Sequence, residues 1–503
     1  MRGHFHRIAG PQYAAHGGIV RGGVASAGQS SRSEGAADEV GIGSLSRDRF
    51  AWIALALYIA LGIMLTVHHE AWRDEADTWL MARDAPLSEL TMNLGREAHP
   101  PLWDLMLLPF ARTGFPYETQ AVMQLLIASG AAALLFFFAP FPRVWKLLTA
   151  FSFYMGYEYL AIARAYSLTV LTLFAMAALY RKRFEHPLAF AAVFALFVNS
   201  TVHALIVGVV LGPLFAWQLI RHKTPHLSTA IAIMAIAGAI SGLPMYLAGR
   251  DAVLPPVHRA TEPLLLFSLA GAFAPSFDII TAALAAAIFL IASVAIARDR
   301  QALAALWLSW TALMFIFVFV YRATLRQVGL LVMMLMFALW IADCVRPRAA
   351  DILLKTLLYF SLLLSLQFAF TTWLLEIRYP FSDAKNAAEF LIENHLDQRP
   401  IAGHPPGKAE AVLAYLPPRK KMWYPAENRV GSYMDWRPSL WKADEMPPDV
   451  AIERALKASN DRNLLILTSR PLTIVEKYKL RLLYTTRGPV FGRPDERYFI
   501  YGR

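Results

Sequence analysis

The sequence predicts an α-helical polytopic membrane protein of about eleven transmembrane helices, followed by a small C-terminal α/β domain outside the membrane. Of the 503 residues, 57% are hydrophobic and only 17% are charged, whereas soluble domains are about 45–50% apolar and about 25% charged. The apolar residues form long runs, and the chain turns polar only after residue 378. This composition excludes a cytosolic enzyme, a disordered scaffold and a disulfide-stapled secreted protein.

The N-terminal segment, residues 1–48, is rich in Gly, Ala and Ser and shows no apolar period, which predicts a disordered cytoplasmic tail. No apolar stretch lies near its start, so a cleaved signal peptide is not expected. The first apolar run, 52–67, follows Arg47 and Arg49. Because positive charge beside a span stays on the cytoplasmic side, the N-terminus is expected inside.

Further apolar runs define the transmembrane domain, expected over 49–377. They lie at 119–139, 145–157, 160–180, 187–200, 203–220, 227–248, 275–297, 302–320, 328–345 and 352–375. The runs at 145–157 and 187–200 are shorter than the ~20 residues that a spanning helix needs, and we expect them to be kinked or partial.

Basic residues between the runs agree with this topology. With eleven spans and the N-terminus inside, five groups fall in cytoplasmic loops: Arg143/Lys146, Arg181/Lys182/Arg183, Arg221/Lys223, Arg298/Arg300 and Arg346/Arg348. The 70–117 loop, the 249–264 loop and everything after Arg378 are then outside. These cytoplasmic basic groups explain the net charge of +11. We therefore expect the lipid bilayer as a partner and do not expect the chain to bind nucleic acid. The single cysteine, Cys344, is expected to be a small membrane hydrophobe.

The C-terminal segment, 378–503, alternates helix-like and strand-like stretches, which predicts an extracytoplasmic α/β domain with a partly parallel sheet. Helices are expected at 381–395 (with Ser382 as N-cap), 409–416 and 449–459, and strands at 400–403, 463–468 and 497–501. Aromatic residues at 422–425 and 433–436 suit stacking on sugar faces. Packing inside the domain is their more common role.

The first outer loop carries an acidic cluster directly after a span, formed by Glu70, Asp74, Glu75 and Asp77. Charge at this depth is costly unless it meets water, a partner or a ligand. Asp74 and Asp77 are three residues apart and share a face of a helix. Such carboxylates can act as a general base or bind a divalent cation. The alternative is a solvated helix N-terminus, where the helix dipole stabilises acidic side chains.

Ionisable residues elsewhere near the outer side are further candidates. His99, before Pro100 and Pro101, can donate to an anion or cap a helix. Glu158 and Arg164 lie within an apolar region, where ionisable groups mark functional sites unless they merely pair with each other.

Three more candidates follow along the chain. His203 lies at a helix break on the same side, where a hydrogen-bonded core histidine is the common alternative. Arg322 and Arg326 lie at an outer boundary, where positive charge is unexpected. Arginine suits phosphate recognition, and snorkelling to lipid headgroups is the alternative.

The ordered motifs resemble the GT-C superfamily of polyprenyl-phosphate-sugar glycosyltransferases, whose members include protein O-mannosyltransferases and the lipid A aminoarabinose transferase. The resemblance covers about residues 50–375. It rests on Asp74-Glu75 after the first helix, His-Pro-Pro-Leu at 99–102, Arg-x-Tyr-Ser at 164–167 and a late Arg326. Gln327 departs from the pattern, because related bacterial sequences carry His there.

The resemblance implies a glycosyltransferase that moves a hexosyl or pentosyl group from a polyprenyl-phosphate-linked sugar to a glycolipid, polysaccharide or protein acceptor. Asp74 would be the catalytic base, with Glu75 beside it. The substrate-binding residues would be His99, Glu158, Arg164, Tyr166, His203, Arg322 and Arg326. The resemblance implies no particular cofactor. It leaves open whether Asp74 and Asp77 bind a divalent cation.

Two other functions remain as alternatives. A multi-pass transporter would show internal repeats and midplane acids, whereas this chain shows no repeat and its acids cluster outside the membrane. A non-catalytic envelope-assembly membrane protein is opposed by the retained Asp74-Glu75 pair. The composition is rich in Arg and Ala, and the sequence has no eukaryotic retention signal. Both features favour a protein of the bacterial inner membrane with a periplasmic active site.

Overall fold

The computed structural model describes residues 48–249, 264–276, 278–342, 349–437, 440, 445–459 and 461–503. The unit Asp48–Arg503 is compact. Several expectations lie outside the described residues: the tail before Asp48, nearly all of the 249–264 loop, Cys344 and the Arg346/Arg348 group.

Six helices in the described ranges are long and apolar enough to cross a membrane. They are α2 (Arg49–His68), α6 (Thr119–Phe138), α10 (Val202–Arg221), α11 (Leu227–Gly249), α14 (Arg300–Phe315) continued by the π-helical turn η3 (Ile316–Val320), and α17 (Ala349–Arg378). Shorter apolar helices are α9 (Pro187–Val198), α13 (Ile279–Ala295) and the pair α15 (Leu325–Val328) and α16 (Leu330–Ile341). The expected count of eleven spans is not confirmed.

Large apolar side chains lie exposed on these helices, among them Trp52, Leu57 and Phe360. Apolar surface of this extent is typical of contact with acyl chains rather than water. The interior is a continuous core to which α2, α6, α8 (Tyr166–Leu179), α10 and α16 contribute. The chain is therefore a helical membrane protein, as its composition predicts.

The chain is broken where the sequence suggested spans at 145–157 and 160–180. A short helix, α7 (Arg143–Ala150), leads to the π-helical turn η1 (Tyr154–Glu158), and regular structure resumes only at Tyr166. Residues 159–165 are buried, and the backbone there bonds to side chains: Gln124 Nε2 donates to the Tyr159 carbonyl at 2.8 Å. Irregular backbone at membrane depth is stable only when the protein satisfies it in this way.

The 70–117 loop folds into three short helices, α3 (Arg73–Asp84), α4 (Leu87–Glu97) and α5 (Leu102–Arg112). At the start of α3 the Glu75 carboxylate accepts the backbone N–H of Trp72 at 3.2 Å, which is one half of a capping box. Helix α4 ends at Ala98 in the left-handed conformation, and Pro100 and Pro101 then set the turn into α5. This turn presents His99 between two helices.

The C-terminal domain contains one six-stranded mixed sheet with the strand order β3-β2-β1-β4-β6-β5. Its strands are β1 (Ile401–His404), β2 (Met422–Tyr424), β3 (Arg429–Gly431), β4 (Leu465–Thr468), β5 (Arg481–Thr485) and β6 (Phe499–Gly502). Strand β1 is parallel to β2 and β4, and the other pairs are antiparallel. The sheet is thus partly parallel, as predicted.

The helices of this domain are α18 (Ala384–Glu393), α19 (Pro406–Ala414) and α21 (Pro448–Ala458). Helix α18 begins later than the sequence suggested, with Asp383 at the N-cap position, and Ser382 Oγ accepts the Ala384 N–H at 3.2 Å.

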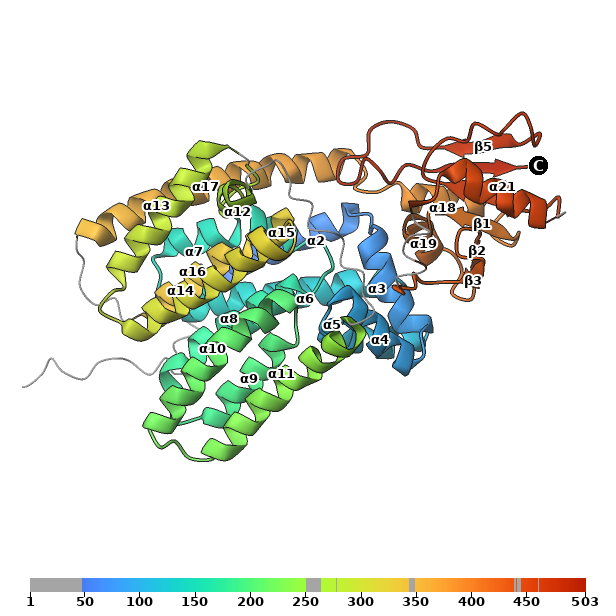
Figure 1. Ribbon diagram of the computed structural model, residues 1–503. Coiled ribbons are helices and arrows are strands. Elements are labelled where there is room, and N and C mark those ends of the chain that lie inside the picture. Colours follow the sequence, from blue (N-terminus) through green and yellow to red (C-terminus); the bar gives the residue numbers. More distant parts are fainter. Residues whose placement is uncertain are drawn as a thin grey trace, which may run out of the picture. The chain divides into compact units, whose positions relative to one another are not determined.

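The C-terminal domain and the 70–117 loop share one hydrophobic core. Helix α3 packs against both α5 and α19 (Figure 1), and Trp79, Trp103 and Val412 are buried together in that core. Polar contacts add to the packing: Tyr433 donates to Glu89 Oε2 at 2.7 Å. The domain therefore helps to hold α3, which carries Asp74, Glu75 and Asp77 of the acidic cluster.

Candidate active site

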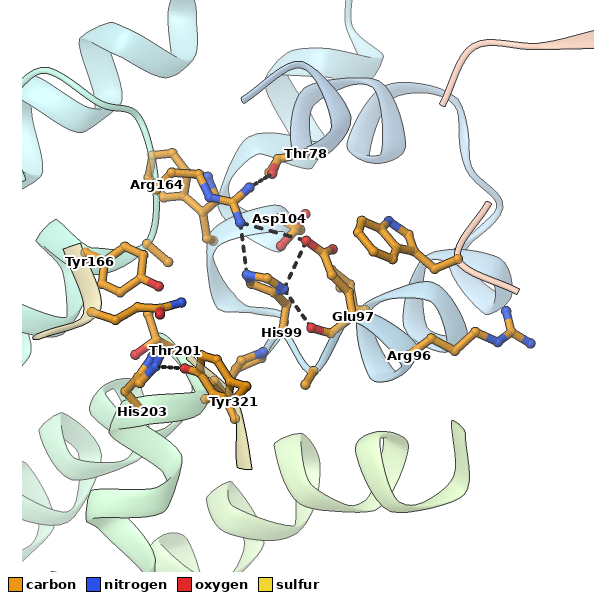
Figure 2. A pocket seen from close by; sticks show the side chains of 18 of the residues that line it. Thr78, Arg96, Glu97, His99, Asp104, Arg164, Tyr166, Thr201, His203 and Tyr321 are labelled. Atoms are coloured by element: carbon orange, nitrogen blue, oxygen red, sulfur yellow. Dashed lines mark hydrogen bonds and ion pairs between the residues drawn. The ribbon is translucent and has the colours of Figure 1, made fainter. Parts of the chain in front are cut away.

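A cavity of about 360 Å³ lies between the 70–117 loop, the break before α8, the start of α10 and the end of η3 (Figure 2). Its polar lining includes Thr78, Glu97, His99, Asp104 and Arg164. Its apolar lining includes Leu94, Val202, Val320 and Tyr321. A pocket of this kind can hold a ligand that is polar at one end and apolar at the other.

Arg164 links the helices around the cavity. One nitrogen, Nη1, donates to the backbone carbonyl of Asp74 at 2.6 Å and to Thr78 Oγ1 at 2.9 Å. The other, Nη2, lies 2.9 Å from His99 Nε2 and 3.8 Å from Glu97 Oε1 (Figure 2). With only 8% of the residue exposed, this guanidinium fixes the start of α3 against the turn between α4 and α5.

The partners of His99 define its protonation. Arginine has no acceptor, so Nε2 must accept from Arg164 and must lack a proton. The proton then sits on Nδ1, which faces Glu97 Oε1 at 3.1 Å. Burial, with the positive charge of Arg164, lowers the pKa of His99. His99 is therefore a neutral imidazole at physiological pH.

Three carboxyl groups near the cavity have raised pKa values. Burial raises the pKa of Glu97 to about 7, against the opposing charge of Arg164. Burial and the nearby Glu97 raise the pKa of Asp77 and of Asp104 well above the usual range. Asp77 Oδ2 accepts from Trp436 Nε1 at 3.1 Å, which brings an aromatic residue of the C-terminal domain into the cavity wall.

Asp74 has the opposite electrostatic setting. Its Oδ1 lies 3.5 Å from Arg73 Nε and its Oδ2 lies 3.8 Å from Arg326 Nη1, and about a third of its side chain (33%) is exposed. Burial raises the pKa of this carboxyl, but Arg164, Arg326, Arg73 and Arg493 outweigh burial and lower it. Asp74 is therefore an ionised carboxylate that a substrate can reach.

Arginine side chains surround Asp74 on the side of Trp72. Arg326 lies 4.9 Å from the centroid of the Trp72 ring and 4.0 Å, through Nε, from Glu158 Oε2. Arg493, from the C-terminal domain, stacks on the same ring at 3.4 Å. Positive charge exceeds negative charge here, which suits an anionic ligand.

Comparisons with known proteins place this geometry in a known fold. No family model matches the chain, and no curated protein matches its sequence. A solved structure, ArnT from Cupriavidus metallidurans bound to undecaprenyl phosphate, is similar over 92% of this chain and 98% of its own. The TM-score is 0.50 and the sequence identity is 13%.

The chain has the fold of this ArnT. This likeness confirms the fold that the ordered motifs predicted. Within this ArnT-like fold, both the helical membrane part and the C-terminal domain have counterparts, because the similarity extends over nearly the whole of both chains.

Glu75 lies in a buried network and not at the cavity. It is 1% exposed; its Oε1 accepts the Ala163 N–H at 2.6 Å and its Oε2 lies 3.1 Å from His69 Nε2. His69 Nδ1 lies 2.8 Å from Glu376 Oε1, and Tyr157 donates to the other oxygen of Glu376 at 2.5 Å. Burial lowers the pKa of His69, but Glu75 and Glu376 raise it well above its usual value. The network joins α2, α3, η1 and α17.

The other expected substrate-binding residues divide into two groups. Tyr166 and His203 line the cavity, and His203 Nε2 hydrogen-bonds to the Tyr321 hydroxyl. Arg322 is exposed and lies over Phe267 at 4.8 Å, outside the cavity lining.

Glu158, Arg326 and Asp74 also lie outside the cavity lining, although Arg164 in the lining donates to the Asp74 carbonyl. Glu158 pairs with Arg326, and Arg164 pairs with Glu97. Glu158 and Arg164 therefore do not simply pair with each other. Among the residues that the structure describes, no three His, Cys, Asp or Glu side chains are grouped to hold a metal ion.

Sequence reasoning missed Glu97, Asp104 and Arg493 as site residues. Glu97 and Asp104 flank the His-Pro-Pro-Leu motif, so their nearness to His99 was an available signal. Arg493 lies in the polar tail between two strands, and no local pattern distinguishes it from the exposed arginines around it.

Proposed function

We propose that this chain is an integral membrane glycosyltransferase that moves a sugar from a polyprenyl-phosphate carrier to an acceptor at the outer face of the inner membrane. The observation that carries the proposal is the ionised, partly exposed Asp74, set among arginines beside a cavity in an ArnT-like membrane fold. The solved ArnT was bound to undecaprenyl phosphate, a carrier of the proposed class.

Asp74 is the proposed catalytic base. Its carboxylate accepts the proton of the acceptor hydroxyl or amine as that atom attacks the anomeric carbon of the donor sugar. The bond from the anomeric carbon to the phosphate oxygen breaks, the sugar is transferred with inversion, and the carrier leaves as polyprenyl phosphate. A positioned base of this kind contributes about 10²–10⁴-fold.

Arginines near Asp74 stabilise the phosphate that departs. Arg326 lies 3.8 Å from Asp74 Oδ2 and has only a distant pairing with Glu158 at 4.0 Å, so its charge is available to a second anion. Fixed cations that face developing negative charge lower the barrier without reorganising during the reaction. Arg164 is a positioning residue in this scheme, because it holds the backbone of Asp74.

The cavity is the proposed place for the donor sugar. Its volume of about 360 Å³ is within the range of about 300–1,000 Å³ that is typical of small-molecule sites. His99, Asp104 and Trp103 offer polar groups and an aromatic face to the sugar. Val320 and Tyr321 in its apolar lining suit the isoprenoid unit that adjoins the phosphate.

The proposed orientation follows the charge pattern of the sequence. The N-terminus is cytoplasmic, and the first outer loop and the C-terminal domain are periplasmic. The acceptor is then an envelope glycolipid, a surface polysaccharide or a protein, which meets the donor at the outer leaflet.

The test compares cells with the wild-type chain, with Asp74→Asn and with a matched control, Asp84→Asn, at the exposed end of α3. Mass spectrometry of lipid-linked sugars and envelope glycans identifies the sugar and the acceptor. We expect Asp74→Asn to reduce transfer at least 100-fold while membrane insertion is unchanged, and Asp84→Asn to behave as the wild type. Full transfer by Asp74→Asn would exclude the proposed base, and solute transport independent of a lipid-linked sugar would favour a transporter.

A further inference from the structure

Arg493 makes no close ion pair with the described residues, although the charges of Asp74 and Glu496 act on it. Among the described residues, no carboxylate lies within 4.0 Å of its guanidinium, and its Nε is buried without a hydrogen-bond partner. The guanidinium stacks on the ring of Trp72, with 3.4 Å between its central carbon and the ring centroid. A stacked arginine whose donors are unused can bind an anion at its edge, because stacking occupies the face and leaves the N–H groups free.

The backbone around Arg493 is held firmly in place. Its N–H donates to the Phe381 carbonyl at 2.8 Å, and the Phe491 N–H donates to the Pro380 carbonyl at 2.9 Å. Gly492 lies so close to Phe381 that a Cβ atom there would be 2.1 Å from the ring. The turn is therefore fixed against the segment that follows α17, and glycine is required next to Arg493.

Glu496 fastens the same turn to the start of α3. Its Oε2 accepts the Ser382 hydroxyl at 2.7 Å, and its Oε1 accepts the backbone N–H of Arg73 at 3.4 Å. This carboxylate is thus engaged by groups other than the Arg493 guanidinium. The contacts bring the tail of the C-terminal domain to the residue directly before Asp74.

The electrostatic neighbours of Arg493 are those of the proposed phosphate site. Burial lowers the pKa of Arg493, and the positive charge of Arg326 lowers it further, while Asp74 opposes both. Arg326 lies over the same Trp72 ring at 4.9 Å. Two guanidinium groups on one indole, with Arg73 beside them, face the carboxylates of Asp74 and Glu158, so positive charge is in excess next to the base.

We infer that Arg493, carried by the C-terminal domain, binds the phosphate of the lipid carrier together with Arg326, with the Trp72 ring as their common support. The inference rests on the proposed function and extends it: the C-terminal domain is part of the donor site. Paired guanidinium groups suit a phosphate because each offers two parallel N–H donors to its oxygens.

The test measures binding of undecaprenyl phosphate to the full chain in phosphatidylcholine nanodiscs, by native mass spectrometry. The variant is Arg493→Gln, and the matched control is Arg497→Gln, an exposed arginine of the same tail that bonds only to the Gly488 carbonyl. We expect Arg493→Gln to weaken binding about tenfold, Arg493→Lys to restore part of it, and Arg497→Gln to leave it unchanged. Thermal unfolding of each variant confirms that the fold is intact, and Arg493→Lys, which keeps charge and stem, tests the site if the glutamine variant fails to fold.

The outcomes separate this inference from the proposed function. Wild-type protein that does not bind undecaprenyl phosphate would overturn the proposed carrier and with it this inference. Wild-type binding that Arg493→Gln leaves unaltered would overturn the inference alone, and the proposed base would stand. Phosphatidylglycerol that displaces undecaprenyl phosphate at equal mole fraction would assign Arg493 to a phospholipid headgroup and would equally overturn it. In transfer assays we expect the KM for the carrier to rise more than kcat falls.

Discussion

The guanidinium of Arg164 donates to the backbone carbonyl of Asp74 at 2.6 Å, and it does so from the irregular segment between η1 and α8. The same side chain reaches Thr78 and His99. The break in the membrane helices thus determines where the proposed base lies. If residues 159–165 continued as a straight helix, the Arg164 side chain would not contact both α3 and the turn between α4 and α5.

Arg164→Lys is expected to lower kcat about 100-fold while the affinity for the carrier changes less than threefold. Lysine has one nitrogen and cannot reproduce the contacts that the two terminal nitrogens of Arg164 make with Asp74, Thr78 and His99. Transfer kinetics with a fixed acceptor measure the split. The control is Arg83→Lys at the far end of α3, where the side chain pairs with Asp84. A large loss of carrier affinity with little change in kcat would instead make Arg164 a phosphate ligand.

Glu75→Gln is expected to lower the free energy of unfolding and to have a smaller effect on binding of the carrier. The substitution removes the charge that pairs with His69 and leaves a buried imidazole with one carboxylate, Glu376, in place of two. Removal of one partner from a buried charged pair costs about 3–5 kcal/mol, and an amide retains part of the hydrogen bonding. We therefore expect a loss of about 2 kcal/mol in the free energy of unfolding, measured by denaturation in nanodiscs.

The control for this change is Glu118→Gln, an exposed acid at the N-cap of α6, directly after the 70–117 loop. Unchanged stability with abolished transfer would contradict the positioning role of Glu75 and would place its carboxylate among the reacting groups. Because Ala163 and Trp72 donate backbone N–H groups to Glu75, a weakened network should also move Arg164, and kcat should fall moderately.

The sequence predicts the long apolar helices well, because the length and hydrophobicity of a run such as 203–220 or 352–375 indicate both a helix and a lipid environment. It also predicts the partly parallel sheet, since strands and helices alternate after residue 378. The break at 159–165 is different. Apart from Arg164, its residues continue the apolar pattern of a span, and the irregular backbone is satisfied there by Gln124 and Glu75, which are distant in sequence.

The site follows the same division. His99 and Arg164 line one cavity, whereas Asp74 and Arg326, which the ordered motifs group with them, lie outside its lining. The pairing of Glu158 with Arg326 and the stacking of Arg493 on Trp72 depend on how the C-terminal domain and α15 pack against α3. Such long-range contacts leave no periodic signal in a single sequence.

The pH dependence of stability should report Glu97. Burial raises its pKa to about 7, whereas an unfolded chain gives glutamate a pKa of about 4.3. Between these values the folded state binds more protons than the unfolded state, so the free energy of unfolding falls as pH rises from about 5 to about 8. The stabilising, protonated form is fully present below pH 4 and is lost as pH passes through 7.

Glu97→Gln is therefore expected to flatten the decline in stability between pH 5 and pH 8 by on the order of 2 kcal/mol. Part of the slope should remain, because burial also raises the pKa of Glu496 to about 7. Asp74 should not contribute in this window, since its lowered pKa keeps it ionised throughout. Thermal unfolding across the range measures the slope, and a decline equal to that of the wild type would mean that Glu97 is already ionised at pH 5 and that Arg164 outweighs its burial.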